Sequence, residues 1–545
     1  MTPTRWITSP QDLAACPQAQ GNPSLLALAG LLWSRPVVGA VTLLFDGLAL
    51  QFGVPDEASA RWLSQVHGDD ESWPVALSAA DPAATPETCG FDLAHPLLGL
   101  SLETSRRHPL PNQRDQRPGE WQHPVLQVKS AAFFVRILTQ RNLGLGESFL
   151  AGEYRMLRGS VHHFVGFFVA NRLDRHIKLP ARQQARLFLQ YARWRAAHSH
   201  NEDIADHYDI GDNIMVPMLG ATGCYSCGYM EHESDSLDRM QQNKIDLIFS
   251  KLRLAPGMRV LDTGCGNGGM LVHAALSWGC TGEGFTNSHN MASLARRNAQ
   301  SNGVAEKVTI HHADFKLLAT YPDAHFDAIY EVGVWEHLPF ADYTEVMRQC
   351  QRILKPSGRM LIHSMGSHQK THLRDGYIQK YIFRDSNQIR LHLLLDEARK
   401  HDLYVADVEN IGRHYYWTLW YWRLNLLAAY EADRSISEHD FRVMLYFLEC
   451  GMAEARFGDG SVYHLLLYKD ARDYRHTWRV DARVHAVGRG AVHATAFLMK
   501  PCNLNEHLHN HANVEGKLEL PVYRKPGMLA RLRQWLTTVT HVRHQ

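Results

Sequence analysis

The stretch VLDTGCGNGG, Val260 to Gly269, decides the fold of this chain. It begins with two apolar residues typical of a buried strand and continues with Asp262. Further along it carries four glycines: Gly264, Gly266, Gly268 and Gly269. Glycine lets a backbone turn sharply and come close to a ligand. With a helix expected from about Met270, the stretch predicts a strand, a ligand-binding turn and a helix.

The spacing of these glycines distinguishes between kinds of loop. It is not G-x-x-x-x-G-K, which excludes a nucleotide phosphate loop. It is D-x-G-x-G-x-G, which class I methyltransferases use to hold S-adenosylmethionine, and not quite the G-x-G-x-x-G of dinucleotide-binding enzymes. The next expected strand ends in GFTNS (Gly284–Ser288), without the acid that holds a ribose hydroxyl in dehydrogenases. Asp314 ends the third strand, where an adenine amino group could be bound. These features weaken the dinucleotide alternative without removing it.

Residues 201–470 alternate apolar strands with amphipathic helices, which predicts an α/β fold with a parallel sheet. The strand candidates are MRVLDTGCGNGG, CTGEGFTNS, KVTIHHADF, FDAIYEVGV and GRMLIHSM.

The rest of the chain divides into four further parts. Residues 1–22 are expected to be disordered, and residues 23–175 to form a smaller α+β domain. In that domain, VTLLFDGLALQFG (Val41–Gly53) predicts a hairpin, and LQVKSAAFFVRILTQRNLGLGESFLAGEYRM predicts a strand, a helix and a glycine-rich turn. Residues 176–200 are expected to be a helical connector, and residues 471–545 a separate C-terminal extension.

The composition bounds the class of protein. Lys and Arg number 57 against 56 Asp and Glu, so no global field draws the chain to nucleic acid, and we expect no such partner. Nine scattered cysteines predict a reducing cytoplasm. The N-terminus is polar, so we expect no signal peptide there. The most apolar stretch, Leu25–Trp33, is too short for a membrane span, which needs about 20 residues.

Seven motifs follow one another in a characteristic order. They are HYDIGDN, YSCGYM, QQNKIDLIFSKLRLAPGMRVLDTGCGNGG, VGVWEHLPFADY, LKPSGRMLIHSMGS, QKYIF and HYYWTLWYW. In this order they resemble the cyclopropane-fatty-acid synthases and mycolic acid cyclopropane synthases. The resemblance covers most of residues 30–470. It implies a Rossmann-like class I methyltransferase domain with a seven-stranded, mostly parallel sheet and a lipid-binding-like N-terminal domain.

The resemblance also implies the activity and its site. S-adenosylmethionine would methylate the double bond of an unsaturated phospholipid acyl chain, and a bound bicarbonate would remove a proton from the resulting carbocation. The implied catalytic residues, which hold the bicarbonate, are Cys227, Glu336, His363 and Tyr415, with the Met365 backbone as a further contact. The implied cofactor-binding residues are Tyr208, which closes over the site, Tyr225, Ser226, Asp262, Gly264, Gly266, Gly268, Thr286, Ser288, Asp314 and Phe315. Glu336 and His363 directly follow expected strands, where open α/β sheets bind ligands.

Several departures from the family pattern leave the product open. Asn267 replaces a usual Trp, Met291 a common Gln, and EHLP the common EHVG or EHFG. The cation could close to a cyclopropane ring or lose another proton to give a methylated alkene. The aromatic run His414–Trp422 could stabilise the cation or line the core or a lipid tunnel.

Other signals have more than one interpretation. Cys224 and Cys227 form a C-x-x-C pair, but a metal site needs two further ligands and no second such pair exists. We interpret His337 as a helix-start or supporting residue. His507, His509 and His511 could bind zinc or lie in an exposed loop. Residues 526–545 predict a basic amphipathic helix, which would either settle on the inner face of a membrane or pack on the protein itself.

Two other function classes stay open from the sequence. Plant amine N-methyltransferases look like the same family, and an inactive lipid-binding protein could keep the fold. The intact loop and catalytic positions favour the lipid-modifying enzyme, which could be a homodimer.

Overall fold

The computed structural model describes residues 5–33, 39–46, 48–53, 124–173, 212–232, 234–367, 375–383 and 388–470. Four expectations lie outside these ranges: the connector 176–200, Tyr208, the histidines 507–511 and the amphipathic helix 526–545. By compactness, residues 1–485 form one unit and residues 486–545 another.

A seven-stranded sheet forms the centre of residues 212–470, in the order β11-β12-β10-β9-β6-β7-β8. Its strands are β6 (Arg259–Asp262), β7 (Thr281–Thr286), β8 (Val308–His312), β9 (Phe326–Val332), β10 (Leu354–Gly366), β11 (Tyr404–Asn410) and β12 (Ser461–Tyr468). β12 runs antiparallel to both of its neighbours, and the pairs from β10 to β8 are parallel. The expected α/β fold with a mostly parallel sheet is therefore confirmed. The winding reverses between β6 and β9, and open sheets of this kind bind ligands at that point.

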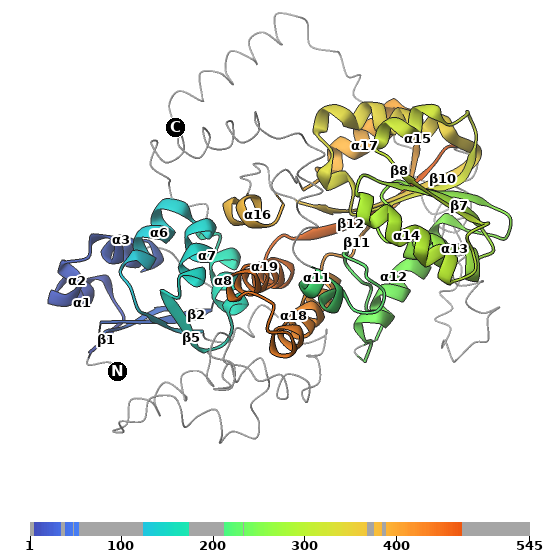
Figure 1. Cartoon of the computed structure of the whole chain (residues 1–545). Coiled ribbons are helices and arrows are strands. Elements are labelled where there is room, and N and C mark those ends of the chain that lie inside the picture. Colours follow the sequence, from blue (N-terminus) through green and yellow to red (C-terminus); the bar gives the residue numbers. More distant parts are fainter. Residues whose placement is uncertain are drawn as a thin grey trace, which may run out of the picture. The chain divides into compact units, whose positions relative to one another are not determined.

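Helices cover both faces of this sheet (Figure 1). On one face lie α12 (Leu237–Leu252), α13 (Gly269–Ser277) and α14 (His289–Ser301), and on the other lie α15 (Tyr343–Ile353) and α17 (Leu391–Lys400). Four further helices pack in a core shared with the N-terminal domain: α11 (Asp212–Leu219), α16 (Gly376–Tyr381), α18 (His414–Ala432) and α19 (Glu438–Phe457). The short 3-10 turns are η3 (Phe315–Thr320), η4 (Trp335–His337) and η5 (Phe340–Asp342). Strand residues alternate between two cores: Val260 packs with α12, α13 and α14, and Leu261 packs with α15 and α17. Among the described helices, none has the length and apolar composition to cross a bilayer.

All five strand candidates became strands, β6 to β10. β11 and β12 were not among the candidates. β11 is exposed along much of its length. Its sequence, YVADVEN, therefore shows no apolar run from which a strand could be predicted. β12 is fully buried but carries a histidine, His464, in the middle of its apolar run.

The N-terminal sheet has the order β1-β3-β2-β4-β5. Its elements are β1 (Arg5–Ile7), α1 (Pro10–Ala14), α2 (Pro17–Gln20), α3 (Pro23–Trp33), β2 (Ala40–Phe45), β3 (Leu48–Gly53), β4 (Val125–Val128), α6 (Ala132–Gln140), α7 (Asn142–Leu150), β5 (Tyr154–Arg158) and α8 (Val161–Ala170). The antiparallel pairing of β2 with β3 confirms the hairpin. The expectation of disorder before residue 23 is wrong for the described part. β1 pairs with β3, and Leu13 and Cys16 bury their side chains in the core.

The NLGLG stretch forms helix α7, where the sequence predicted a turn. Its glycines serve close packing. A Cβ on Gly144 would lie 2.1 Å from the carbonyl oxygen of Arg136, and one on Gly146 would lie 2.2 Å from Cδ2 of Tyr377. Tyr377 belongs to α16, so Gly146 lets α7 of the N-terminal domain approach the helix that lies between β10 and β11 in the chain.

Replacing Gly146 with alanine should therefore destabilise the protein. The Tyr377 ring is fully buried and cannot swing away, so the added methyl group should lower the free energy of unfolding by about 1–3 kcal/mol. Gly30→Ala is the matched control, since no atom lies within 4 Å of its Cβ and alanine favours a helix by about 1 kcal/mol. Urea denaturation measures both variants, and an equal loss in the two would contradict this role of Gly146.

Candidate active site

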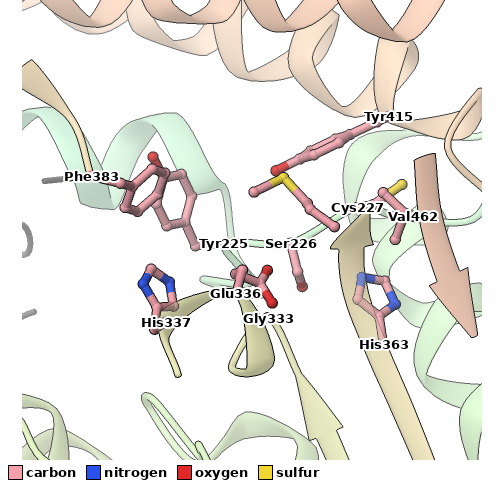
Figure 2. Close-up of a pocket in the computed structure, with 11 residues that line it drawn as sticks. Tyr225, Ser226, Cys227, Gly333, Glu336, His337, His363, Phe383, Tyr415 and Val462 are labelled. Atoms are coloured by element: carbon pink, nitrogen blue, oxygen red, sulfur yellow. The ribbon is translucent and has the colours of Figure 1, made fainter. Parts of the chain in front are cut away.

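A small pocket lies at the carboxyl ends of β9 and β10, beneath the start of α18 (Figure 2). It is lined by Tyr225, Ser226, Cys227, Gly333, Glu336, His337, His363, Met365, Phe383, Tyr415 and Val462. The enclosed space is about 30 Å³. A single water needs about 10–15 Å³ by the same measure, so the pocket has room for two or three waters or one small anion. The four residues that the sequence predicted to be catalytic all line it.

Glu336 provides the carboxyl group of the pocket. It lies in η4, directly after β9, and is 4% exposed. The hydroxyl of Ser364 donates a hydrogen bond to its Oε2. Burial raises the pKa of Glu336 to about 7, although the Ser364 hydroxyl and the backbone N–H groups act against the rise. The carboxyl is thus able to gain or lose a proton near neutral pH.

His363 lies on β10 directly opposite His464 on β12. Nδ1 of His363 is 2.8 Å from Nε2 of His464, and both rings are buried. Burial, followed by the positive charges of Lys244 and Lys251, lowers the pKa of His363 well below its usual value. His363 is therefore a neutral imidazole.

Cys227 and Tyr415 close the pocket on the side of α18. The Cys227 thiol is 1% exposed and donates to the carbonyl oxygens of Gly228 at 3.3 Å and Ile411 at 3.8 Å. Burial raises its pKa, so it remains a thiol. Burial and the neighbouring Tyr225 likewise raise the pKa of Tyr415, whose hydroxyl points into the pocket (Figure 2).

A buried lysine holds the segment that carries Tyr225, Ser226 and Cys227. The Lys244 ammonium, on α12, donates to Oγ of Ser226 at 2.9 Å and to Oε1 of Gln241 at 2.8 Å. Gln241 in turn donates to the carbonyl oxygen of Ser226 at 2.9 Å. Both side chains are fully buried. Since a buried ammonium is stable only with such partners, these bonds fix Ser226 at the pocket wall.

The glycine loop follows β6 as the sequence predicted. Oδ1 of Asp262 accepts a hydrogen bond from the N–H of Gly264 at 3.1 Å, and burial raises the pKa of Asp262 to about 7. Gly266 and Gly268 have φ of 50° and 74°, a conformation that favours glycine. Asn267, at the position of the family's usual Trp, donates to the carbonyl oxygen of Thr222 at 3.3 Å, which ties the loop to the segment before Tyr225.

The other predicted cofactor residues lie where β7 and β8 end. Thr286 ends β7, and Ser288 caps α14 by accepting from the N–H of Met291. Asp314 caps η3 by accepting from the N–H of Lys316 at 2.9 Å, and the Phe315 ring packs edge-on against Phe285. They share the carboxyl edge of the sheet with Asp262, as a bound nucleoside would require. Their contacts with a cofactor stay predictions.

Three buried residues of the site were missed from the sequence: Lys244, Ser364 and His464. Only His464 carried a signal, as an ionisable side chain within an apolar strand. His337 lines the pocket and packs against Phe383, so it lies in the wall itself and not behind it. Cys224 and Cys227 are free thiols, and the described ranges hold no group of three potential metal ligands.

Comparison with known proteins identifies the family. A family model for mycolic acid cyclopropane synthetase matches residues 195–465. The cyclopropane-fatty-acyl-phospholipid synthase of Escherichia coli (strain K12) is 32% identical over 351 residues, which cover 63% of this chain and 87% of the relative. The chain belongs to the cyclopropane synthase family. It is accordingly a methyltransferase that uses S-adenosylmethionine, as its glycine loop predicted.

The chain is also similar to a sphingolipid methyltransferase and to a cyclopropane synthase of known structure. Sphingolipid C9-methyltransferase B of Emericella nidulans is 28% identical over 281 residues, which cover 49% of this chain and 54% of the relative. The solved cyclopropane synthase MmaA2 of Mycobacterium tuberculosis is 25% identical, covers 50% of this chain and 99% of its own, and has a TM-score of 0.47.

Removing the Lys244 ammonium should weaken cofactor binding in this family member. Lys244→Met loses the bonds that hold Ser226 and Gln241, and we expect the Kd for S-adenosylmethionine to rise about tenfold, the effect of losing one charged hydrogen bond. Lys251→Met is the matched control, because Lys251 is an equally buried lysine of α12 whose partners, Asp407 and Glu409, lie on β11. Calorimetric titration should show an unchanged Kd in the control. A wild-type Kd in Lys244→Met would contradict the proposed role.

The stability of the protein should report the raised pKa of Glu336. Between about pH 4.5 and 7 the folded protein keeps a proton that the unfolded chain releases, so the wild type loses stability as the pH rises through this window. Glu336→Gln carries no charge and escapes this loss. In urea denaturation we expect the variant and the wild type to be similar near pH 4.5. Near pH 8 the variant should be more stable by about 3 kcal/mol. An advantage that does not grow with pH would show that the carboxyl is not buried in this way.

Proposed function

We propose that the chain converts an unsaturated acyl chain of a phospholipid into its cyclopropane derivative. The observation that carries this proposal is the gathering of Cys227, Glu336, His363 and Tyr415 around one small pocket. The E. coli relative, named for this activity, is similar over 87% of its length, which includes more than the methyltransferase domain. The first-listed relatives and the family model support a lipid substrate over a small amine.

The reaction balances without a further oxidant or reductant. The π electrons of the alkene attack the sulfonium methyl group, the S–C bond breaks, and S-adenosylhomocysteine leaves. The other alkene carbon becomes a carbocation. Loss of one proton from the new methyl group lets its C–H electrons close the three-membered ring. The site has to align the two reactants, exclude water from the cation and accept that proton.

The pocket fits a bicarbonate ion in size and in donors. About 30 Å³ is enough for a small anion, and the wall offers the Tyr415 hydroxyl and the His363 imidazole as donors. A bound bicarbonate would supply the base that takes the proton. Glu336, with a pKa of about 7, would accept a hydrogen bond from the protonated ion and can hold the proton before it reaches solvent. Ser364 orients the Glu336 carboxyl for this task.

A methylated alkene is the second candidate product. It requires only that the carbocation lose a proton from the acyl chain instead of the new methyl group. The similarity to a sphingolipid C9-methyltransferase, named for methylation and not for cyclopropane formation, supports this second product. For either product we propose that the substrate is reached at the cytoplasmic face of a membrane.

Fatty-acid analysis after expression in a bacterium that lacks its own cyclopropane synthase tests the proposal. We expect a loss of unsaturated chains and a high-field proton NMR signal from the ring. A vinylic methyl signal would assign the second product. Unchanged lipids, together with intact cofactor binding, would overturn the proposal and favour a small-molecule methyltransferase.

The same assay with purified enzyme tests whether the reaction requires bicarbonate. In carbonate-free buffer the rate should fall by about tenfold or more, within the usual effect of one general base, and added bicarbonate should restore it. Glu336→Gln is the folded, inactive control. A full rate without carbonate would leave Glu336 itself as the base and remove bicarbonate from the mechanism.

A further inference from the structure

His363 and His464 are both neutral, so each ring carries one hydrogen, on one of its two nitrogens. Their closest nitrogens, Nδ1 of His363 and Nε2 of His464, are 2.8 Å apart, so one must donate and the other accept. Burial and the nearby Lys244 and Lys251 lower the pKa of each ring well below its usual value, so neither carries two protons. Which nitrogen carries the shared hydrogen decides what His363 presents to the pocket.

The far nitrogen of His464 separates the two possibilities. Nδ1 of His464 is buried and has no hydrogen-bond partner within the described residues. If His363 donated to His464, this Nδ1 would bear a buried N–H without an acceptor. If His464 donates to His363, Nδ1 instead holds a lone pair without a donor. Among buried backbone groups, an orphaned N–H is rarer than an under-satisfied acceptor, and we apply the same preference to the imidazole nitrogens.

The surrounding charges favour the same arrangement. The ammonium groups of Lys244 and Lys251 act on both histidines. A positive potential stabilises a bare lone pair and destabilises an N–H group at the same place. Both arguments put the shared hydrogen on Nε2 of His464.

We propose that His464 is a positioning residue that fixes His363 as the Nε2–H tautomer. Nδ1 of His363 accepts from His464, and the remaining hydrogen of His363 lies on Nε2, the one imidazole nitrogen left to serve the pocket. His363 is thereby a hydrogen-bond donor to a bound anion and has no lone pair with which to accept the proton of the carbocation. This functional consequence rests on the proposed function, whereas the tautomer itself does not.

Nitrogen NMR of the full-length protein tests the tautomer directly. With ¹⁵N-labelled histidine, protonated and bare ring nitrogens give well-separated signals, and the spectrum of His363→Gln assigns those of His363. We expect a protonated Nε2 and a bare Nδ1 in the wild type. A protonated Nδ1 on His363 would overturn the proposal, whatever the activity of the protein.

Two substitutions of His464 test the functional consequence. His464→Gln keeps an N–H donor near the position of Nε2 and should preserve the His363 tautomer and the bicarbonate dependence. His464→Leu removes the donor, and we expect a mixture of His363 tautomers and a half-saturating bicarbonate concentration raised about tenfold, the effect of one lost hydrogen bond. The Kd for S-adenosylmethionine should not change in either variant.

Leu466→Ala is the packing control, since Leu466 is a buried residue of the same strand, two positions along. It should lower the unfolding temperature and leave the His363 signals in place. A change of the His363 tautomer in this control would show that the packing of β12, and not the His464 side chain, determines the tautomer. If the protein methylates no lipid and the wild-type tautomer is as proposed, the proposed function fails and the assignment stands. If it methylates lipid and His464→Leu keeps the bicarbonate dependence of the wild type, the positioning role fails.

Discussion

Burial of the pocket between β9, β10 and α18 is the constraint on which the proposed chemistry depends. A carbocation reacts with any nucleophile within reach, and a sulfonium methyl group alkylates a thiolate readily. Burial acts against the formation of charged nucleophiles, because it disfavours the charged form of every ionisable group. Cys227 stays a thiol, His363 stays neutral and Tyr415 keeps its proton. The Cys227 thiol and the Tyr415 phenol thus stay in their weakly nucleophilic neutral forms.

The positive charges lie behind the pocket wall, at the places where they are paired. Lys244 holds the backbone and hydroxyl of Ser226 through direct and Gln241-mediated bonds. Lys251, two turns along α12, pairs with two carboxylates of β11. A buried ion pair stabilises little by itself, but removing one partner leaves a buried charge. β11 therefore matters to the site as the source of Asp407 and Glu409, although its own side chains are largely exposed.

The sequence predicted those features that depend on local pattern. Apolar runs predicted β6 to β10, and the glycine spacing predicted the cofactor loop. Glu336 follows β9 as expected, but His363 lies within β10 and does not follow it, although both residues line the pocket. The pairing of His363 with His464 depends on the register between two strands about 100 residues apart, which no local pattern determines. Ser364 was missed for a related reason: it faces away from its neighbour His363, and only the turn of η4 brings Glu336 to it. α7 was missed because its glycines are selected by contacts with Arg136 and Tyr377 and not by a turn.

The N-terminal domain is joined to the pocket through α18. This helix carries Tyr415 in its first turn and Arg423 two turns later, and Nε of Arg423 donates to Glu449 of α19 at 2.6 Å. The other oxygen of Glu449 accepts from the backbone N–H of His162, on α8, at 2.7 Å. All three side chains are almost completely buried. Separating the N-terminal domain from these helices would expose the Arg423–Glu449 pair and break the bond from the His162 N–H to Glu449, which costs about 1.5–3 kcal/mol as a hydrogen bond to a charged group. The N-terminal domain and the helix that carries Tyr415 should therefore keep their relative position.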